Sequence, residues 1–350
     1  MKFTVQSKLL QEALKRIKLQ GRTTTLPVLC CVKIEAVEGS ISLYTTNLNQ
    51  SFLCHVQAEV EEPGCCCIDL DRLEGFPSSN DLSVKLDGSK ATLRSGRLRA
   101  NIQTLPGSEM PNAPEVSDEA DVSFDYEVPQ GLTDSLSWAQ STLPPVAMDA
   151  FCQGLVVGED QILGTDRNSF HVCETGVPGI GQIIVPLEAL RPFRTLMDNP
   201  TRTVRISLHQ GILVLDADGT TFATRLVHGS IPDFKVFLKR FAASEDIIRC
   251  DAQQLANAVY RCADVTKSHC AALKSDGDGV IQVSCSYGGA YAVEKIDGSF
   301  NAPFEIGLSP LRTAKAFKVF NGEIEIRRAE SAIYISDGKN SAGIGLMKIN

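Results

Sequence analysis

Apolar residues along this chain follow two periods in turn, and this succession of periods occurs three times. Each copy opens with a short alternating run and passes into a segment whose apolar residues stand three and four positions apart. This pattern predicts a strand followed by an amphipathic helix. The three segments are Phe3 to Lys18, Phe124 to Gln140 and Ile248 to Asp264. The chain is therefore predicted to contain three copies of one arrangement.

Each copy continues with two alternating runs separated by a turn rich in Gly and Asp, which is the pattern of a β-hairpin. These turns fall within residues 38–43, 158–163 and 278–283. A further strand then leads into a second short helix, within residues 65–76, 183–196 and 304–317. In the third copy, Ser309 supplies a capping hydroxyl and Pro310 suits the first helical position. A final hairpin closes each copy, as at residues 84–105 and 323–335.

The repeat predicts an α+β protein in which each domain consists of two strand-helix-strand units and the sheets carry helices on one face. A chain of 350 residues also exceeds what one core usually holds. We place three domains at residues 1–117, 118–242 and 243–350. The stretch from Pro111 to Asp121, rich in Pro, Glu and Asp, is predicted to link the first two.

Composition narrows the class of protein. Hydrophobic residues at 43% and charged residues at 22% are typical of a soluble globular protein, and no apolar run is long enough to cross a membrane. The start of the chain, Met1 to Val5, lacks the apolar core of a secretory signal, so we expect a cytoplasmic protein. A net charge of −8 argues against gripping nucleic acid over the whole surface, but it leaves room for a local basic lining.

Twelve cysteines raise the question of a metal site or disulfides. The clusters Cys30 to Cys31 and Cys65 to Cys67 lie in strand-like runs, where neighbouring side chains point to opposite faces and cannot converge on one metal ion. The pairs His269 to Cys270 and His171 to Cys173 lack further ligands at a useful spacing. We therefore expect buried thiols that act as small apolar residues, and no metal or other cofactor.

The sequence offers little support for an enzyme. Residues 176–181 (GVPGIG) resemble a glycine loop but do not join a strand to a helix start, so a surface turn is the better interpretation. No Walker lysine, nucleophile elbow or HExxH motif occurs. We predict no catalytic residues.

Basic residues recur on the outward faces of the predicted helices. In the first helix, one face is apolar and Lys8 and Lys15 lie opposite it; the apolar residues are Leu9, Leu10, Ala13, Leu14 and Ile17. In the helix that opens the third copy, Asn257 and Arg261 are predicted to point outward, and the residues predicted to be buried are Leu255, Val259 and Cys262. A solvated helix face would explain any one of these. Their recurrence in an acidic protein favours faces that converge on phosphates. The candidate DNA-binding residues are Lys8, Lys15, Arg22, Arg72, Arg191, Arg261 and Lys315.

Seven short strings, in order along the whole chain, resemble the sliding clamp of bacterial replicative DNA polymerase, its β subunit. They are Met1 to Val5, Leu26 to Leu29, Thr46 to Leu48, Arg94 to Arg97, Thr104 to Pro106, Gly164 to Arg167 and Leu226 to Phe234. The resemblance implies a three-domain DNA-clamp fold and a head-to-tail homodimer, with helices lining a ring and sheets outside. It implies a non-enzymatic processivity factor that encircles duplex DNA without sequence preference.

The same resemblance implies the partners and their site. DNA polymerase, a clamp loader and other clamp-motif proteins would dock short peptides into a pocket, which it assigns to Cys152, Thr165, Arg167, Asn168, Ser169, Phe170, Pro232, Val236, Phe237, Ile344, Leu346, Met347 and Lys348. The dimer interface would include Arg94, Arg97, Arg99 and Ile102. The alternative is a clamp-like, peptide-binding hub that does not encircle DNA.

Three departures from the family pattern concern these sites. The family usually has Gly-His-Arg-Leu where this chain has Arg167 to Phe170, and Met-Pro-Met-Arg where it has Gly345 to Lys348. The opposing edge of the dimer interface, acidic in the family, is Gly288 to Ala292. Motif preference and ring closure are therefore expected to differ in this chain.

Overall fold

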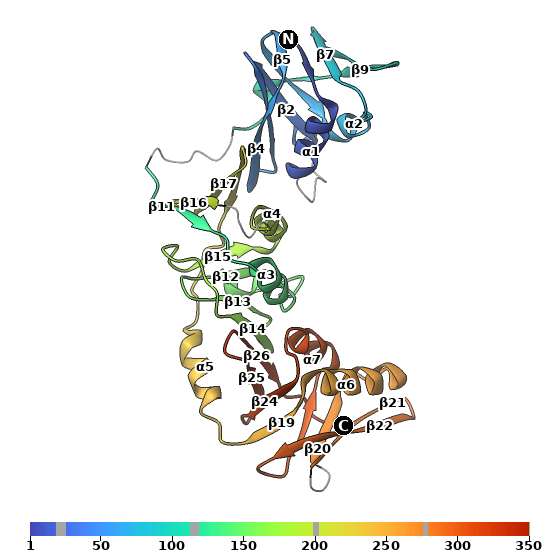
Figure 1. The fold of residues 1–350 in the computed structure, drawn as a ribbon, viewed down its shortest axis with the longest axis vertical. Coiled ribbons are helices and arrows are strands. Elements are labelled where there is room, and N and C mark those ends of the chain that lie inside the picture. Colours follow the sequence, from blue (N-terminus) through green and yellow to red (C-terminus); the bar gives the residue numbers. More distant parts are fainter. Residues whose placement is uncertain (19–25, 113–118, 199–202, 276–278, 350) are drawn as a thin grey trace. The chain divides into compact units, whose positions relative to one another are not determined.

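A computed structural model describes residues 1–18, 26–112, 119–198, 203–275 and 279–349, apart from the side chains of residues 237 and 240. The chain forms two compact units (Figure 1). Unit 1 contains residues 1–129 and 191–226, and unit 2 contains residues 130–190 and 227–350. The predicted boundaries at residues 117 and 242 remain predictions, because each unit combines separate stretches of the chain.

Unit 1 contains two antiparallel sheets and the helices α1 (Ser7–Arg16) and α2 (Leu70–Glu74). The five-stranded sheet has the order β5 (Glu59–Glu62), β1 (Lys2–Val5), β7 (Leu82–Asp87), β8 (Lys90–Ser95) and β9 (Leu98–Gln103). The nine-stranded sheet has the order β10 (Leu105–Pro106), β6 (Gly64–Asp69), β2 (Cys31–Val37), β3 (Ser40–Thr46), β4 (Gln50–Gln57), β18 (Thr220–Arg225), β17 (Ile212–Ala217), β16 (Thr203–His209) and β11 (Val122–Glu127). Helix α4 covers Leu190–Leu196.

Unit 2 contains one twelve-stranded antiparallel sheet and the helices α3 (Leu132–Gln140), α5 (Phe234–Ala242), α6 (Ala252–Thr266) and α7 (Pro310–Phe317). The strand order is β15 (Ile183–Pro186), β12 (Gly154–Val157), β13 (Ile162–Thr165), β14 (Ser169–Cys173), β26 (Asn340–Gly345), β25 (Ala332–Ser336), β24 (Glu323–Arg328), β19 (Ile247–Asp251), β22 (Ala290–Phe300), β21 (Val280–Tyr287), β20 (Ala271–Ser275) and β23 (Glu305–Leu308). The α+β class and the recurring strand-helix-strand pattern predicted from the sequence are confirmed.

The repeat extends to single hydrogen bonds. In α1, the side-chain amide of Gln11 donates to the backbone carbonyls of Leu73 and Phe76, at 2.9 and 3.2 Å. In α6, Gln253 does the same to two carbonyls at the end of α7 and just beyond it, at 3.3 and 2.8 Å. One half-buried glutamine thus fixes the first helix of a copy against the second, in both the first and the third copy.

Two details of the helices differ from the sequence prediction. Leu9 is 39% exposed, whereas Leu10, Ala13, Leu14 and Ile17 are buried. The covered stripe is the i, i+3, i+4, i+7 set that starts at Leu10, and Leu9 lies beside it. The predicted placement of Leu9 is therefore wrong. Helix α5 was not predicted; it begins after a capping aspartate whose carboxylate accepts a hydrogen bond from the third helical residue, at 3.3 Å.

Successive copies are joined by strand pairing at a constant register. At the junction of β4 with β18, Gln50 to Cys54 pair with Thr220 to Thr224. At the junction of β14 with β26, Ser169 to Cys173 pair with Asn340 to Ile344. Gln50, the second residue after the centre of the turn between β3 and β4, pairs with Thr224, the sixth residue after the centre of the turn between β17 and β18. Ser169 and Ile344 occupy the same two positions after the turns between β13 and β14 and between β25 and β26.

Candidate functional site

A pocket of about 440 Å³ opens in unit 2 where β14 pairs with β26. Its walls come from β13, β14, α5, the loop before β25, and the end of β26. The described lining residues are Phe151, Thr165, Arg167, Asn168, Phe170, Pro232, Phe234, Phe241, Ser331, Ala332, Gly343, Ile344, Gly345 and Leu346. Four aromatic rings and several aliphatic groups thus surround a few polar atoms, as is usual for a site that binds a ligand.

The base of this pocket requires a glycine. Phe170 in β14 faces Gly343 in β26, and a Cβ atom on Gly343 would lie 2.2 Å from the Phe170 ring. The ring of Phe170 also lies 6.0 Å from that of Phe241 and 6.5 Å from that of Tyr334, measured between centroids. The bare glycine backbone therefore leaves room for the Phe170 ring in the pocket, among other aromatic rings.

The turn from Thr165 to Ser169 shapes one wall. The hydroxyl of Thr165 donates to the carbonyl of Ser169 at 2.8 Å and accepts from the backbone N–H of Arg167 at 3.1 Å. A carboxylate oxygen of Asp166 accepts from the N–H groups of Asn168 and Ser169, at 3.0 and 2.6 Å. These bonds hold Arg167 at φ +72°, a left-handed conformation that usually favours glycine. Strain at Arg167 is thus offset by the turn's own hydrogen bonds.

Arg167 places a positive charge at the rim of the pocket. Its side chain is 69% exposed, and its Nε atom lies 3.2 Å from a carboxylate oxygen of Asp149. An ion pair this exposed contributes little to stability. A carboxylate of a bound ligand can therefore replace Asp149 as the partner of Arg167 at a small cost in free energy.

A half-buried ion pair supports the same turn. Arg312 in α7 donates two hydrogen bonds, of 3.0 and 2.9 Å, to the second carboxylate oxygen of Asp166. Burial disfavours the charge on Asp166, but the hydrogen bonds from Arg312 and Ser169 outweigh this effect and lower the pKa of Asp166. Sequence analysis did not identify Arg312, because it lies 146 positions from Asp166 and no local pattern connects the two residues.

The structure brings together about half of the residues that the sequence assigned to the pocket. Those that line it are Thr165, Arg167, Asn168, Phe170, Pro232, Ile344 and Leu346. The described lining does not include Cys152, Ser169, Val236, Met347 or Lys348. Val236 is 61% exposed, because it follows Phe234 by two positions on α5 and so points elsewhere. The side chain of Phe237 lies outside the described residues.

Four apolar lining residues were missed by sequence analysis: Phe151, Phe234, Phe241 and Ala332. Phe234 and Phe241 stand seven positions apart on α5 and therefore share a face of the helix. That spacing is a signal the sequence contains. It was overlooked because residues 234–242 were not interpreted as a helix.

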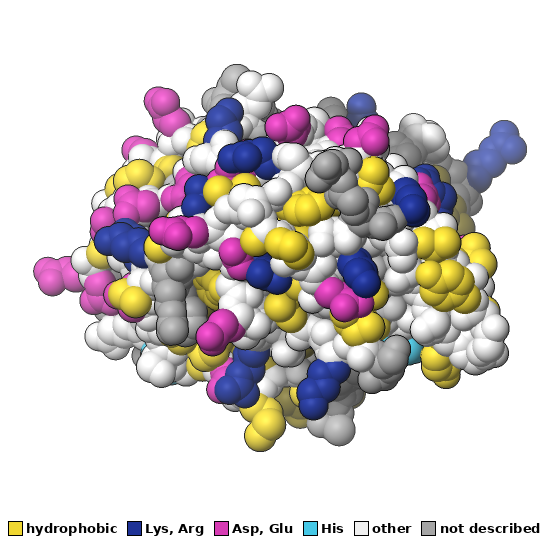
Figure 2. Space-filling view, turned by 90° about the horizontal axis from the view of Figure 1, so that it is seen from below, with side chains coloured by type: hydrophobic (Ala, Val, Ile, Leu, Met, Phe, Trp, Pro, Cys, Tyr) yellow, Lys and Arg dark blue, Asp and Glu magenta, His cyan; other side chains and the backbone are white. Residues whose placement is uncertain are grey.

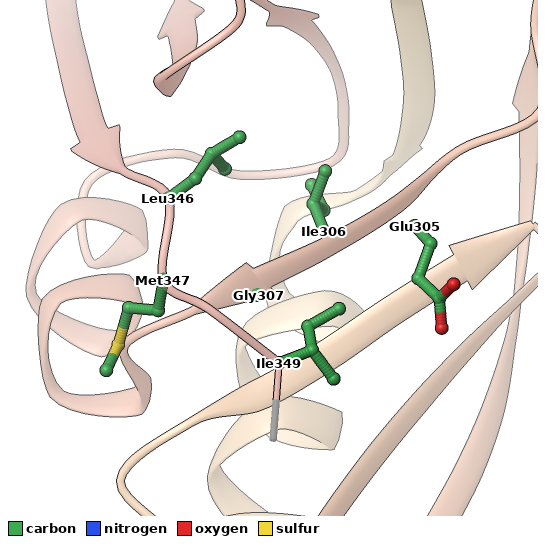
Figure 3. Close-up of a pocket in the computed structure, with 6 residues that line it drawn as sticks. All are labelled: Glu305, Ile306, Gly307, Leu346, Met347 and Ile349. Carbon is green, nitrogen blue, oxygen red and sulfur yellow. The ribbon is translucent and has the colours of Figure 1, made fainter.

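Residues 346–349 lie beside β23, an edge strand of the twelve-stranded sheet, next to a separate cavity of about 500 Å³ (Figure 3). The N–H of Met347 donates to the carbonyl of Gly307 in β23 at 2.8 Å. Figure 3 shows the Met347 side chain pointing away from Ile306 and Ile349. A Cβ atom on Gly307 would lie 2.5 Å from the Met347 carbonyl oxygen, so the tail approaches β23 closely. Leu346 lines both cavities, whereas Met347 lines the one at β23.

The candidate DNA-binding residues lie on the predicted helices where these are described. Lys8, Lys15, Arg72 and Arg191 are exposed, and Lys315 is half-buried. Arg261 is exposed but donates a 3.0 Å hydrogen bond from Nε to Glu294, which compensates its charge. Arg22 lies outside the described residues. On the face drawn in Figure 2, basic and acidic side chains are interspersed.

The candidate interface residues belong to one hairpin. Arg94 lies in β8, Arg97 in the turn, and Arg99 in β9, and all three are exposed. Ile102 in β9 is buried on the opposite face of the strand. In the described sheets, β9 is an edge strand whose one neighbour is β8.

His171 belongs to the core of unit 2. It is 1% exposed; its ring stacks on that of Trp138 at 4.3 Å between centroids, and its Nδ1 atom lies 2.9 Å from the Trp138 carbonyl oxygen. Among the described residues, no group of three or more His, Cys, Asp or Glu is placed to hold a metal ion. Likewise, no described helix has the length and apolar character needed to cross a membrane.

Sequence comparisons point to one family. Residues 1–114 match the sequence model described as the N-terminal domain of the DNA polymerase III beta subunit. The beta sliding clamp of Salmonella typhimurium is 25% identical over 284 residues, which are 75% of this chain and 76% of that protein. The beta sliding clamp of Escherichia coli K12 is 26% identical over 258 residues, 69% and 68% of the two chains.

Solved structures agree in fold over the whole chain. The DNA polymerase III subunit beta from Pseudomonas aeruginosa and the beta sliding clamp from Caulobacter crescentus each superpose with a TM-score of 0.90, at 20% identity and with both chains fully covered. The fold is therefore that of a three-domain DNA clamp. Residues 1–114 thus match the DNA polymerase III beta subunit family, and the chain as a whole is similar to bacterial beta sliding clamps in sequence and in fold.

Proposed function

We propose that this processivity factor closes around duplex DNA as a head-to-tail ring dimer and tethers its partners through the pocket at β14 and β26. The observation that carries the proposal is the pair of unused edges. Each internal junction joins the last strand of one copy to the fourth strand of the copy before it. In the described sheets, β9 is the strand of the first copy that corresponds to β18 and β26, and it lacks such a neighbour. The first half of β22, the fourth strand of the third copy, lacks one as well. Two chains would supply each other's missing neighbours at these two strands, as in a head-to-tail ring.

Attraction to DNA would come from Lys8, Lys15, Arg72 and Arg191, with smaller contributions from Lys315 and from Arg261, whose charge is compensated by Glu294. A closed ring is held on DNA by topology, so weak contacts with phosphates are sufficient. This reconciles the net charge of −8 with DNA binding. The contacts would be insensitive to base sequence.

The pocket supports binding of short peptides from a DNA polymerase, a clamp loader and other clamp-motif proteins. Phe170, Phe234 and Leu346 offer burial for an apolar anchor, at roughly 25 cal/mol per Å² of apolar surface. The exposed side chain of Arg167 can form an ion pair with an acidic group of the peptide. We propose a role without catalysis, carried out in the cytoplasm where these partners act.

Two measurements test this function. Sedimentation equilibrium should give a mass of twice 37.9 kDa. The protein, loaded by its own loader on a nicked circular plasmid, should remain bound through gel filtration and should be released when a restriction enzyme linearises the plasmid. Equal retention on circular and linear DNA, or a peptide-binding monomer, would instead support a hub that does not encircle DNA.

A further inference from the structure

We propose that the ring junction pairs Ala290 to Glu294 of one chain with Leu98 to Ile102 of the other, with Ala292 opposite Ala100, and that apolar and aromatic contacts rather than ion pairs hold it. This inference rests on the proposed ring dimer. It adds the register of the junction and its chemistry.

The register follows from the constant geometry of the internal junctions. Both pair the second residue after one turn centre with the sixth residue after the other, and both contain five pairs. The turn between β21 and β22 is centred between Gly288 and Gly289, and that between β8 and β9 is centred between Gly96 and Arg97. The same rule therefore places Ala290 opposite Ile102 and ends at Glu294 opposite Leu98.

The distribution of side chains over the two faces agrees with this register independently. Along β22, Ile296 is buried, and Glu294 reaches Arg261 of α6, so the even-numbered residues face the helix side. Along β9, Ile102 is buried opposite Ala91, which again assigns the even-numbered residues to the core side. In the proposed register, even-numbered residues of β22 pair with even-numbered residues of β9, so the core sides of the two strands match. A shift by one residue would place the core side of one strand against the outer face of the other.

The outer face of the proposed junction contains no acid. There, Val293 lies opposite Arg99, and Tyr291 lies opposite Asn101, diagonal to Arg99. Tyr291 is 63% exposed, which leaves its ring available to cover the Arg99 guanidinium. Glu294, the one acid between Ala290 and Glu294, is on the other face and already accepts hydrogen bonds from Arg261. Arg99 therefore meets an aromatic and an aliphatic side chain instead of a carboxylate.

Cross-linking tests the register. The Ala100→Cys variant is mixed with the Ala292→Cys variant and oxidised; in parallel, Ala100→Cys is mixed with Ala290→Cys. Opposed residues of an antiparallel pair lie within disulfide range, whereas residues two positions further along do not. We expect a covalent dimer from the first mixture, with a yield at least about fivefold higher than from the second or from the unsubstituted protein. An equal or higher yield from the second mixture would overturn the register.

Salt and one aromatic substitution test the chemistry. The dimer dissociation constant should change less than about threefold between 50 and 500 mM NaCl, because charge pairing contributes little. Tyr291→Ser should weaken the dimer about tenfold or more, whereas Tyr287→Ser, an equally exposed tyrosine outside the five pairs, should not. Steep salt dependence, or equal effects of the two substitutions, would overturn the non-ionic junction. A monomer at all concentrations would instead refute the ring itself.

Discussion

Arg312 holds both the position and the charge of Asp166, through hydrogen bonds of 3.0 and 2.9 Å to one carboxylate oxygen. The other oxygen organises the turn that forms a wall of the peptide pocket. Arg312 does not line the pocket itself, so it acts as a positioning residue. Helix α7 and the pocket are thus mechanically linked through one carboxylate.

Replacing Arg312 with Met should therefore weaken peptide binding without a direct contact being lost. We expect about a tenfold higher dissociation constant for a fluorescent peptide from the cognate polymerase, since the turn loses its anchor and Asp166 is left half-buried without its partner. Fluorescence anisotropy measures this. Arg72, the corresponding third residue of α2, provides the control, and Arg72→Met should bind the peptide as the unsubstituted protein does. Equal binding by both variants would refute the positioning role.

The two neighbouring tail residues should differ in their effect on peptide binding. Leu346→Asp places a charge in the pocket wall and should cost roughly 2 kcal/mol or more of binding free energy. Met347→Asp changes a side chain that lines the cavity at β23, so calorimetry with the same peptide should show a much smaller loss. The reverse order would mean that Met347 swings into the pocket when peptide binds. Dimer mass should be unchanged in both variants.

Positive charge on α1 should affect DNA contacts more than positive charge on the sheet. The double variant Lys8→Ala, Lys15→Ala should lower retention on nicked circular DNA, and the difference should fade as salt rises and screens the phosphates. Lys85→Ala removes an exposed lysine from β7 and should have no effect. Loss of dimer mass in the double variant would show that α1 supports the fold of unit 1 rather than DNA contacts.

His171 should make stability depend on pH in the acidic range. Burial lowers its pKa from 6.5 to about 4, so below pH 6.5 the unfolded chain binds a proton that the folded chain does not. Stability should be complete above pH 6.5 and decline as pH falls toward 4, by on the order of 3 kcal/mol in all. Urea unfolding at pH 7, 6 and 5 should show a shallower decline for His171→Phe. The exposed His55, changed to Gln, should leave the decline intact; identical profiles for all three proteins would assign the effect to other groups.

Periodicity predicted the repeat well, because each copy buries one face of its helices and strands against the same kind of core. The glutamine bonds of Gln11 and Gln253 show how far that equivalence extends. Leu9 shows its limit, since a helix wheel gives the direction of a side chain but not the width of the surface that covers it. Helix α5 was not predicted, because it is a short segment outside the strand-helix-strand repeat from which the other helices were predicted.

The family resemblance named about half of the residues that line the cavity at β14 and β26. Phe170 and Ile344 were inferred from resemblance, and the pairing of β14 with β26 explains why they meet. Arg312 and Gly343 were not inferred, because their importance depends on contacts between distant parts of the chain: a guanidinium fork on Asp166, and the absence of a Cβ atom under an aromatic ring. No local pattern carries that information.

The constant register between copies has an evolutionary consequence. The internal junctions share one register, and the proposed junction between chains follows the same rule, so the polypeptide need not continue across a junction to set it. Gene fusion or fission can therefore change how many copies one chain contains without redesigning any contact surface. What such an event does change is where the ring can be opened, because a junction crossed by the backbone stays tethered when its strands separate, and a junction between chains does not.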